Sequence, residues 1–361
     1  MAALPRDVHP AAWWAWALGL AAAASRTTNP WLLVLLTLTA SLMVAARRTD
    51  APWALSFRWY LWFGLVIVVL RVLFRILFGG GLGSTVLLDL PTVGLPSWAA
   101  GITLLGPVTK ESVLAGLYDG MRLATILICV GAANALANPR RLLAAMPAAL
   151  YEVGTALVVA LAVFPQLGES LERVRRARRL RAEPPKGVHG VRSLLVPVLE
   201  DALERSLKLA ASMDVRGYGR SGTSTRADRR LTGSLLVGGL LGLCVGTYAF
   251  LDFSAPRFLA VPMLVAGVAL AAAGFVVAGR RVQRTTYRPD PWGFAEVLTA
   301  GSGVAVAVVF TVVAHRDPLV LVPDVAAPPQ LSALSLVAVL LALLPLVGTP
   351  RPALQTREVA A

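Results

Sequence analysis

Arginine is the side chain whose placement in this chain most clearly suggests a chemical role. One group of arginines lies in the segment 177–182, Ala-Arg-Arg-Leu-Arg-Ala, and another arginine lies in 213–219, Met-Asp-Val-Arg-Gly-Tyr-Gly. Each segment ends a stretch with helical periodicity, and a helix C-terminus favours a cation because of the helix dipole. A guanidinium also offers a fork of donors to carboxylates and carbonyls. The two segments therefore fit either capped helix ends or two docking contacts for another protein.

Other reactive residue types do not form a recognisable site. The histidines, His9, His189 and His315, are scattered over predicted loops, and no metalloprotease, nucleophile-elbow or paired-aspartate pattern is present. Cys129 and Cys244 lie inside apolar runs, where cysteine acts as a small hydrophobic residue. We therefore expect a non-catalytic protein with no bound cofactor and no metal.

Composition places these arginines in an integral membrane protein. Hydrophobic residues make up 57% of the chain and charged residues 15%, which leaves too little polar surface for a soluble domain. The apolar runs are close to the roughly 20 residues that a helix needs to cross a bilayer. The net charge of +14 then reflects membrane topology, and we expect a lipid bilayer rather than nucleic acid as the partner.

Eight apolar segments predict an all-α membrane protein with about eight transmembrane helices. They span approximately 11–25, 31–46, 59–78, 113–136, 231–252, 257–279, 293–314 and 330–348. With a cytoplasmic N-terminus, eight crossings leave nearly all arginine-rich turns inside, as the positive-inside rule requires. A further apolar stretch, 148–164, leads directly into arginines that a crossing would place outside. We expect it to lie in or along the membrane without crossing.

These spans divide the chain into four parts. We expect an N-terminal four-helix membrane region at 1–138, a cytoplasmic module at 139–222, C-terminal membrane helices at 231–349 and a cytoplasmic tail at 350–361. The module should contain a short surface helix, a long helix over about 155–181 that Pro165 can kink, and an amphipathic helix over about 197–215.

The last of these helices has two distinct faces. Its expected apolar stripe consists of Leu195, Leu199, Ala202, Leu209 and Met213. On the other side, Asp201 with Arg205 and Glu204 with Lys208 have the four-residue spacing of helical ion pairs.

Charged residues within the predicted spans need partners. Asp119 and Arg122 lie one turn apart, and we expect them to neutralise each other. Arg71 and Arg75 fit either snorkelling towards the interface or pairing inside the bundle. A glycine ladder predicts close helix packing within this chain, at Gly238, Gly242 and Gly246.

Several of these motifs occur together in a known family. The chain resembles the T component of energy-coupling factor transporters, the membrane scaffold of the cobalt- and vitamin-uptake ABC family. The resemblance rests on these motifs: His9-Pro10, Asn29-Pro30, Asp119-Gly120-Met121-Arg122, Asn138-Pro139-Arg140-Arg141-Leu142, Phe164-Pro165 followed by Glu169, and the paired arginine tips. Val215-Arg216-Gly217 matches the second of the family's Ala-Arg-Gly-like triplets. Leu180-Arg181-Ala182 lacks the glycine of the first, so Arg178 and Arg179 are rivals for its arginine.

The resemblance implies a coupling subunit of a bacterial plasma-membrane importer. In the family, each arginine tip docks on one of two cytoplasmic ABC ATPases, and the two helices cross and transmit ATPase closure to a substrate-binding membrane subunit. This chain has no phosphate-binding loop, so ATP must bind elsewhere. The implied ATPase-docking residues are Leu180, Arg181, Ala182, Val215, Arg216 and Gly217. The implied structural or coupling residues are Pro165, Glu169, Met213, Asp214 and Gly219.

The resemblance also implies vitamin or metal-ion uptake and a cytoplasmic module. The last two spans, beyond about residue 285, exceed the family's minimal form and have no assigned role. The alternative is a self-contained secondary transporter or channel, against which the sequence shows no inverted repeat.

Overall fold

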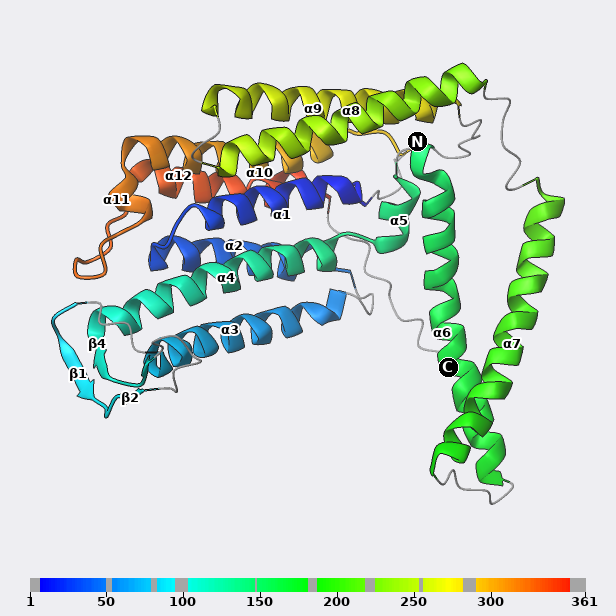
Figure 1. Cartoon of the computed structure of the whole chain (residues 1–361), viewed down its shortest axis with the longest axis horizontal. Coiled ribbons are helices and arrows are strands. Elements are labelled where there is room, and N and C mark those ends of the chain that lie inside the picture. Colours follow the sequence, from blue (N-terminus) through cyan, green and yellow to red (C-terminus); the bar gives the residue numbers. More distant parts are fainter. Residues whose placement is uncertain are drawn as a thin grey trace. The chain divides into compact units, whose positions relative to one another are not determined.

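A computed structural model shows a helical protein that consists of two compact units. It describes residues 7–49, 54–78, 83–94, 103–146, 148–180, 187–217, 225–252, 256–281 and 290–350. One unit combines Met1–Leu142 with Asp290–Ala361, and the other is Leu143–Pro289. The second unit is thus an insertion in the first. The predicted all-α membrane fold is confirmed (Figure 1).

The first unit is built from long helices at both ends of the sequence. Its main elements are α1 (Pro10–Ser25), α2 (Pro30–Arg47), α3 (Phe57–Leu77), α4 (Lys110–Leu136), α10 (Phe294–Arg316), α11 (Pro318–Leu321), α12 (Ala333–Ala342) and α13 (Pro345–Gly348). The short α5 (Pro139–Ala144) follows α4 and runs up to the boundary between the units. The motifs His9-Pro10 and Asn29-Pro30 start α1 and α2, because each side chain caps the helix and proline fits its first turn.

The segment between α3 and α4 contains strands that the sequence did not predict. Strand β1 (Val86–Asp89) pairs antiparallel with β4 (Pro107–Thr109), and β2 (Val93–Gly94) pairs with β3 (Thr103–Leu104). The sequence also predicts an interfacial segment around Trp98, which lies outside the described residues. Strand β4 leads directly into α4, whose first turn is capped by the Thr109 hydroxyl.

The core of the first unit joins α10–α13 to the first two helices. Its fully buried side chains include Trp16, Leu20, Leu32, Leu36, Met43, Val306, Phe310 and Leu321. Trp16 Nε1 donates to the Ala342 carbonyl at 3.0 Å, and Asn29 Nδ2 donates to the carbonyls of Val320 and Gln330. Figure 1 shows α10 beside α1. The helices beyond about residue 285, which had no predicted role, thus contribute about a quarter of the buried residues of this core.

The closest approach between α1 and α10 is at a pair of glycines. A Cβ atom on Gly19 would overlap the backbone of Gly303, and a Cβ on Gly303 would overlap the backbone of Trp16. Glycine is therefore required at both positions for the two helices to pack at this distance.

The second unit consists of two helix pairs. They are α6 (Tyr151–Leu180) with α7 (Gly187–Val215), and α8 (Arg226–Leu251) with α9 (Arg257–Arg281). The predicted glycine ladder packs within the chain at Gly242 and Gly246, which face the backbone of α9. Gly238 does not take part, because Gly239 lies against Ala271 in its place.

Seven helices in the described residues are long and apolar enough to cross a membrane. Six are α2, α3, α4, α8, α9 and α10, which correspond to six of the eight predicted spans. The first predicted span is the 16-residue α1, and the last is divided between α12 and α13. The seventh helix is α6, whose Val153–Ala177 segment qualifies by length and composition. The expectation that 148–164 does not cross rests on charge distribution and stays a prediction.

Candidate functional site: the α6–α7 pair

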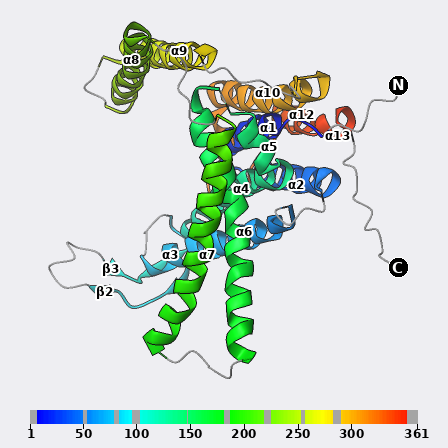
Figure 2. The ribbon, with the colours of Figure 1, turned by 90° about the vertical axis from the view of Figure 1, so that its right-hand side faces the viewer.

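The two helices that carry the arginine tips pack against each other in the second unit. Figures 1 and 2 show α6 and α7 as two long helices that cross each other. Both continue through an internal proline, Pro165 in α6 and Pro197 in α7. The sequence prediction that α7 begins near residue 197 was wrong. It treated Pro197 as a first-turn residue, whereas the helix begins at Gly187 and tolerates the missing backbone donor.

Asp201 is the central residue of the contact between the two helices. Its Oδ2 accepts a hydrogen bond from Ser170 Oγ at 2.7 Å and forms an ion pair with Arg173 Nη2 at 3.1 Å. Ser170 and Arg173 both lie on α6. Its Oδ1 accepts from Arg205 Nε of α7 at 3.0 Å. Ser170, at this contact, is 4% exposed, and Val198, one turn before Asp201 on α7, is 7% exposed. One carboxylate therefore joins α6 to α7.

The surroundings of Asp201 favour its charged form. The hydrogen bond from Ser170 lowers the pKa of Asp201 below its ordinary value, against partial desolvation, and Arg205 and Arg173 lower it further. The contact is therefore charge-assisted at neutral pH. Both ion pairs expected along α7 are confirmed, since Lys208 Nζ also lies 2.6 Å from Glu204 Oε1 on the exposed side.

The C-terminus of α7 presents its arginine to the surroundings. Val215 is 89% exposed and Arg216 follows it on the surface. Gly217 has a φ of 77°, a conformation that favours glycine, and its N–H donates to the Asp214 carbonyl at 2.9 Å. Gly217 therefore ends the helix directly after Arg216. Of the neighbouring candidates, Met213 is half-buried and Asp214 is exposed.

The C-terminus of α6 is described only as far as Leu180, which is 85% exposed. Arg181 and Ala182 lie outside the described residues, as does Gly219 beyond the second tip. Arg179 is exposed, and the structure does not describe the side chain of Arg178. The choice of arginine for the first tip therefore stays open.

Two coupling candidates in α6, Pro165 and Glu169, are exposed. Glu169 makes no polar contact within the part of the chain that the structure describes, whereas the next residue, Ser170, lies against α7. Ser170 and Arg173 were missed by the sequence reasoning. The sequence feature that could have indicated them is a small polar residue one turn before an arginine in one helix, together with a carboxylate near the middle of the next helix.

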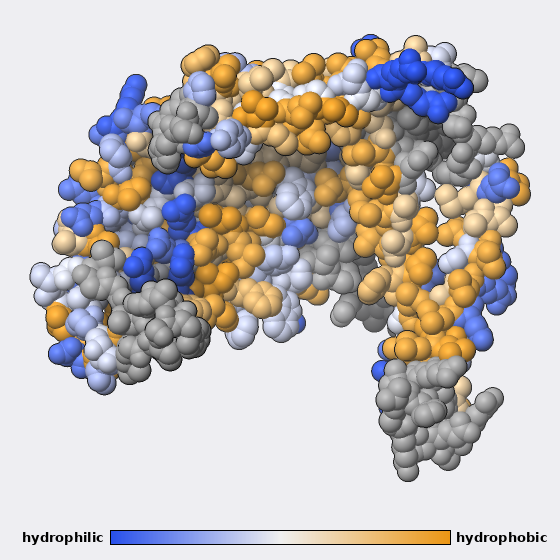
Figure 3. Space-filling view, viewed as in Figure 1, coloured by the Kyte–Doolittle hydropathy of each residue, from blue (hydrophilic) through white to orange (hydrophobic). Residues whose placement is uncertain are grey.

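Most of the large apolar side chains on this pair are not covered by the chain itself. On α6, Leu157, Leu161 and Phe164 are exposed. On α7, Leu195, Leu199 and Leu209 of the predicted stripe are also exposed, and Ala202 and Met213 are half-buried. In the right-hand part of Figure 3, hydrophobic residues cover much of the visible face of the pair. The stripe is therefore available to lipid or to another protein.

The charges within the predicted spans pair differently from the expectation. Asp119 Oδ2 lies 3.6 Å from Arg75 Nη2, so an aspartate of α4 pairs with an arginine of α3. The predicted pairing of Asp119 with Arg122 was wrong, because one-turn spacing within a helix gives no information about a neighbouring helix. Of the two possibilities for Arg75, the structure shows pairing inside the bundle.

Comparison with known proteins identifies the family. No curated protein matches the chain. The model of the family CbiQ, described as cobalt transport protein, matches residues 2–225, which is more than half of the chain and includes α1–α7. Helices α8–α13 lie beyond the matched segment. The chain, with its exposed arginine tip and its α6–α7 pair inside the matched segment, belongs to the CbiQ family of cobalt transport proteins.

Proposed function

We propose that this protein is the non-catalytic coupling subunit of an energy-coupling factor importer. In this proposal, two cytoplasmic ABC ATPases bind the C-terminal tips of α6 and α7, and a separate membrane subunit binds the vitamin or metal ion that is imported. The observation that carries the proposal is the pair of long helices joined at Asp201, with Leu180 and Val215 almost fully exposed at their ends.

The dimensions of the pair suit the transmission of motion. At 1.5 Å per residue, Leu180 lies about 15 Å along α6 from Ser170, and Val215 lies about 21 Å along α7 from Asp201. Because a packed helix moves as a rigid element, displacement of one tip displaces the rest of that helix through the contact at Asp201. The uncovered apolar side chains of α6 and α7 provide the surface on which the substrate-binding subunit detects this motion.

The proposed topology places residues 139–222 and the N-terminus in the bacterial cytoplasm. The arginine-rich segments support this orientation by the positive-inside rule, and they also support a position for residues 148–164 along the membrane rather than across it. The two arginine tips are then on the side where ATP is available.

Charge reversal at the tips tests the proposal. We expect Arg216→Glu and Arg181→Glu to weaken ATPase binding and uptake by at least tenfold, since a lost charge pair in an interface costs about 2–5 kcal/mol. The measurements are co-purification of the ATPases and substrate uptake per ATP hydrolysed in proteoliposomes. Arg176→Glu, the same change on an exposed side of α6, is the matched control.

Two outcomes would contradict the proposal. Normal uptake in the Arg181→Glu, Arg216→Glu double variant would exclude docking through the tips. Uptake by the wild-type chain alone, without any ATPase in the membrane, would instead indicate the self-contained secondary transporter.

A further inference from the structure

The second unit, which is the inserted unit, is attached to the first unit by two chain segments. The chain leaves the first unit after Leu142 and returns to it at Asp290. Arg141 and Asp290 therefore lie at the two attachment points, almost 150 positions apart in sequence. Any movement of the inserted unit must be accommodated at these two points.

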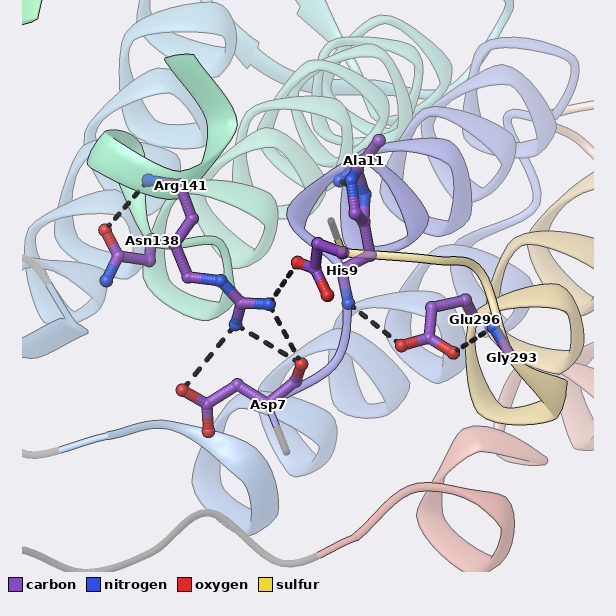
Figure 4. Close-up of polar contacts among 8 residues, drawn as sticks. Asp7, His9, Ala11, Asn138, Arg141, Gly293 and Glu296 are labelled. Carbon is purple, nitrogen blue, oxygen red and sulfur yellow. Dashed lines mark hydrogen bonds and ion pairs between the residues drawn. The ribbon is translucent and has the colours of Figure 1, made fainter. Parts of the chain in front are cut away.

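Arg141 joins the two attachment points. Its Nη2 lies 2.5 Å from Asp290 Oδ2. Its Nη1 lies 3.7 Å from Asp7 Oδ2 (Figure 4). Both terminal nitrogens also donate to the Asp7 carbonyl at 3.2 Å. One guanidinium thus connects the segment before α1, the start of α5 and the segment before α10. We refer to Asp7, Arg141 and Asp290 as the clasp.

The backbone on the Arg141 side is fixed by a helix cap. Asn138 Oδ1 accepts hydrogen bonds from the backbone N–H groups of Arg140 and Arg141, at 3.0 and 3.4 Å. This is the N-cap arrangement for the first turn of α5, so it sets the direction in which the Arg141 side chain leaves the backbone.

The Asp290 side is fixed to α1 by Glu296. This residue is only 4% exposed, and its carboxylate accepts from Gly293 N–H at 2.8 Å and from His9 N–H at 3.4 Å (Figure 4). The His9 ring packs on Trp292 with a centroid distance of 5.6 Å. Together with the glycine contact between α1 and α10, these interactions make the segment after Asp290 a rigid support.

We infer that Arg141 and Asp290 are positioning residues that hold the two attachments of the inserted unit together at one base. The inference rests on the proposed function for its consequence, because a unit tied at one base transmits a push from the ATPases as a body. Asp290 and Glu296 lie beyond the family segment at residues 2–225. Helices α10–α13 thus acquire a role in this chain, which is to anchor the segment that carries Asp290, the carboxylate partner of Arg141.

The Arg141–Asp290 pair should affect the position of the attachment segments more than the stability of the fold. Both side chains of the Arg141–Asp290 pair are about one-third exposed, with values of 30% and 34%, and a partly solvated pair adds little to folding. Loss of the pair should therefore leave the core of α1, α2 and α10 intact. It should release one attachment segment from the other.

The first test measures this freedom on the full chain alone. Spin labels are placed at Leu42 in the first unit and Leu207 in the second, both exposed, in a Cys244→Ser background, and the distance distribution is recorded in nanodiscs by pulsed electron resonance. We expect Arg141→Asp to broaden the distribution about twofold or more, because the two attachment segments are then no longer held to each other. Adding Asp290→Arg should narrow it again, because the pair is restored with reversed charges.

The matched control is Arg140→Asp, an equal charge change on an exposed neighbour whose side chain has no polar contact among the described residues. An unchanged distribution in Arg141→Asp would overturn the inference, as would equal broadening by Arg140→Asp. Failure of the charge swap to narrow the distribution would also overturn it.

The second test measures coupling in the reconstituted complex. Arg141→Asp should raise the ATP hydrolysed per substrate imported several-fold while ATPase co-purification stays at the wild-type level, and the swap should restore the ratio. Failure of the proposed function would be visible separately, since wild-type protein would then retain no ATPases. If Arg141→Asp retains the ATPases and hydrolyses the wild-type amount of ATP per substrate imported, the proposed role of the clasp would be wrong while the proposed function would stand.

Discussion

Asp201 is the residue on which the contact between the proposed coupling helices depends most. It receives one hydrogen bond and one ion pair from α6, through Ser170 and Arg173, and it is held in place by Arg205 from its own helix. Three donors on one carboxylate define the point along their lengths at which α6 and α7 meet, and how each helix is rotated about its own axis. A purely apolar contact between two such helices would allow sliding.

The lowered pKa of Asp201 gives this contact a defined pH dependence. Because the fold favours the ionised form, the contribution of Asp201 is complete above its ordinary pKa of 3.8 and is lost as the pH falls below that value. With spin labels at Leu157 and Leu207, we expect a constant α6–α7 distance distribution from about pH 8 to 4 and a distribution that broadens only as the pH falls below that range.

The control variants use the same labels. Asp201→Asn should give the broad distribution at every pH, and Glu204→Gln, which removes an exposed carboxylate one turn away, should behave as wild type. A narrow distribution for Asp201→Asn at neutral pH would show that the charge does not hold the contact.

At the residue scale, local spacing was predictable and long-range pairing was not. Asp201–Arg205 and Glu204–Lys208 were predicted because four-residue spacing brings side chains together on any helix. The partner of Asp119 was assigned wrongly because Arg75 reaches it from another helix. The clasp was invisible for the same reason, since Arg141 and Asp290 meet only after the whole first unit has folded.

At the element scale, α1 and α10 depend on the absence of side chains at their closest approach. A Cβ atom at Gly303 would overlap the backbone of Trp16, which cannot move away as a flexible side chain could. The apolar periods of both helices were visible in the sequence. Their pairing was not, because more than 280 residues separate Gly19 from Gly303.

Substitution of Gly303 by valine tests this packing. We expect a loss of stability of about 1–3 kcal/mol or more from overpacking, seen as a lower midpoint in thermal unfolding of the purified protein in detergent. Gly301→Val is the matched control, because a Cβ there meets no atom within 4 Å. Equal destabilisation by both variants would attribute the effect to helix propensity rather than to the contact with α1.

Helix boundaries were predictable where apolar length determined them. The predicted spans at 59–78, 113–136 and 293–314 match α3, α4 and α10 closely. The prediction was less successful where another rule competed. Pro197 was taken as a helix start although α7 passes through it, and the strands β1–β4 were missed because their apolar runs are too short to show alternation.

At the scale of the whole molecule, the first unit is formed by helices from both ends of the chain. A linear division of the sequence assigned α8–α13 to one C-terminal region. The structure instead groups α8 and α9 with α6 and α7, and returns α10–α13 to α1 and α2. Hydrophobicity identifies each helix but not its neighbours, since the lipid-facing and protein-facing sides of a membrane helix are similarly apolar.

Truncation tests whether the C-terminal helices are required by the core. We expect a chain that ends at residue 289 to be degraded or to aggregate, because Trp16 loses the Ala342 carbonyl and α1 loses the packing of Val306 and Phe310. Fluorescence-detected size-exclusion chromatography of a tagged chain measures this outcome. A chain that ends at residue 350 should elute as a single peak, and a single peak for the shorter chain would contradict the expectation.

The packing of α1 against α10 also has a consequence for biosynthesis. The ribosome makes Trp16 and Gly19 first, and roughly 290 further residues follow before Phe310 exists. At typical translation speeds of 5–20 residues per second, α1 waits about 15–60 s for the helix that covers it. During that interval its packing face is open to lipid and to the insertion machinery. The first helix to enter the membrane is therefore among the last to reach its final neighbours, and nascent chains stalled before α10 should remain bound to the insertase.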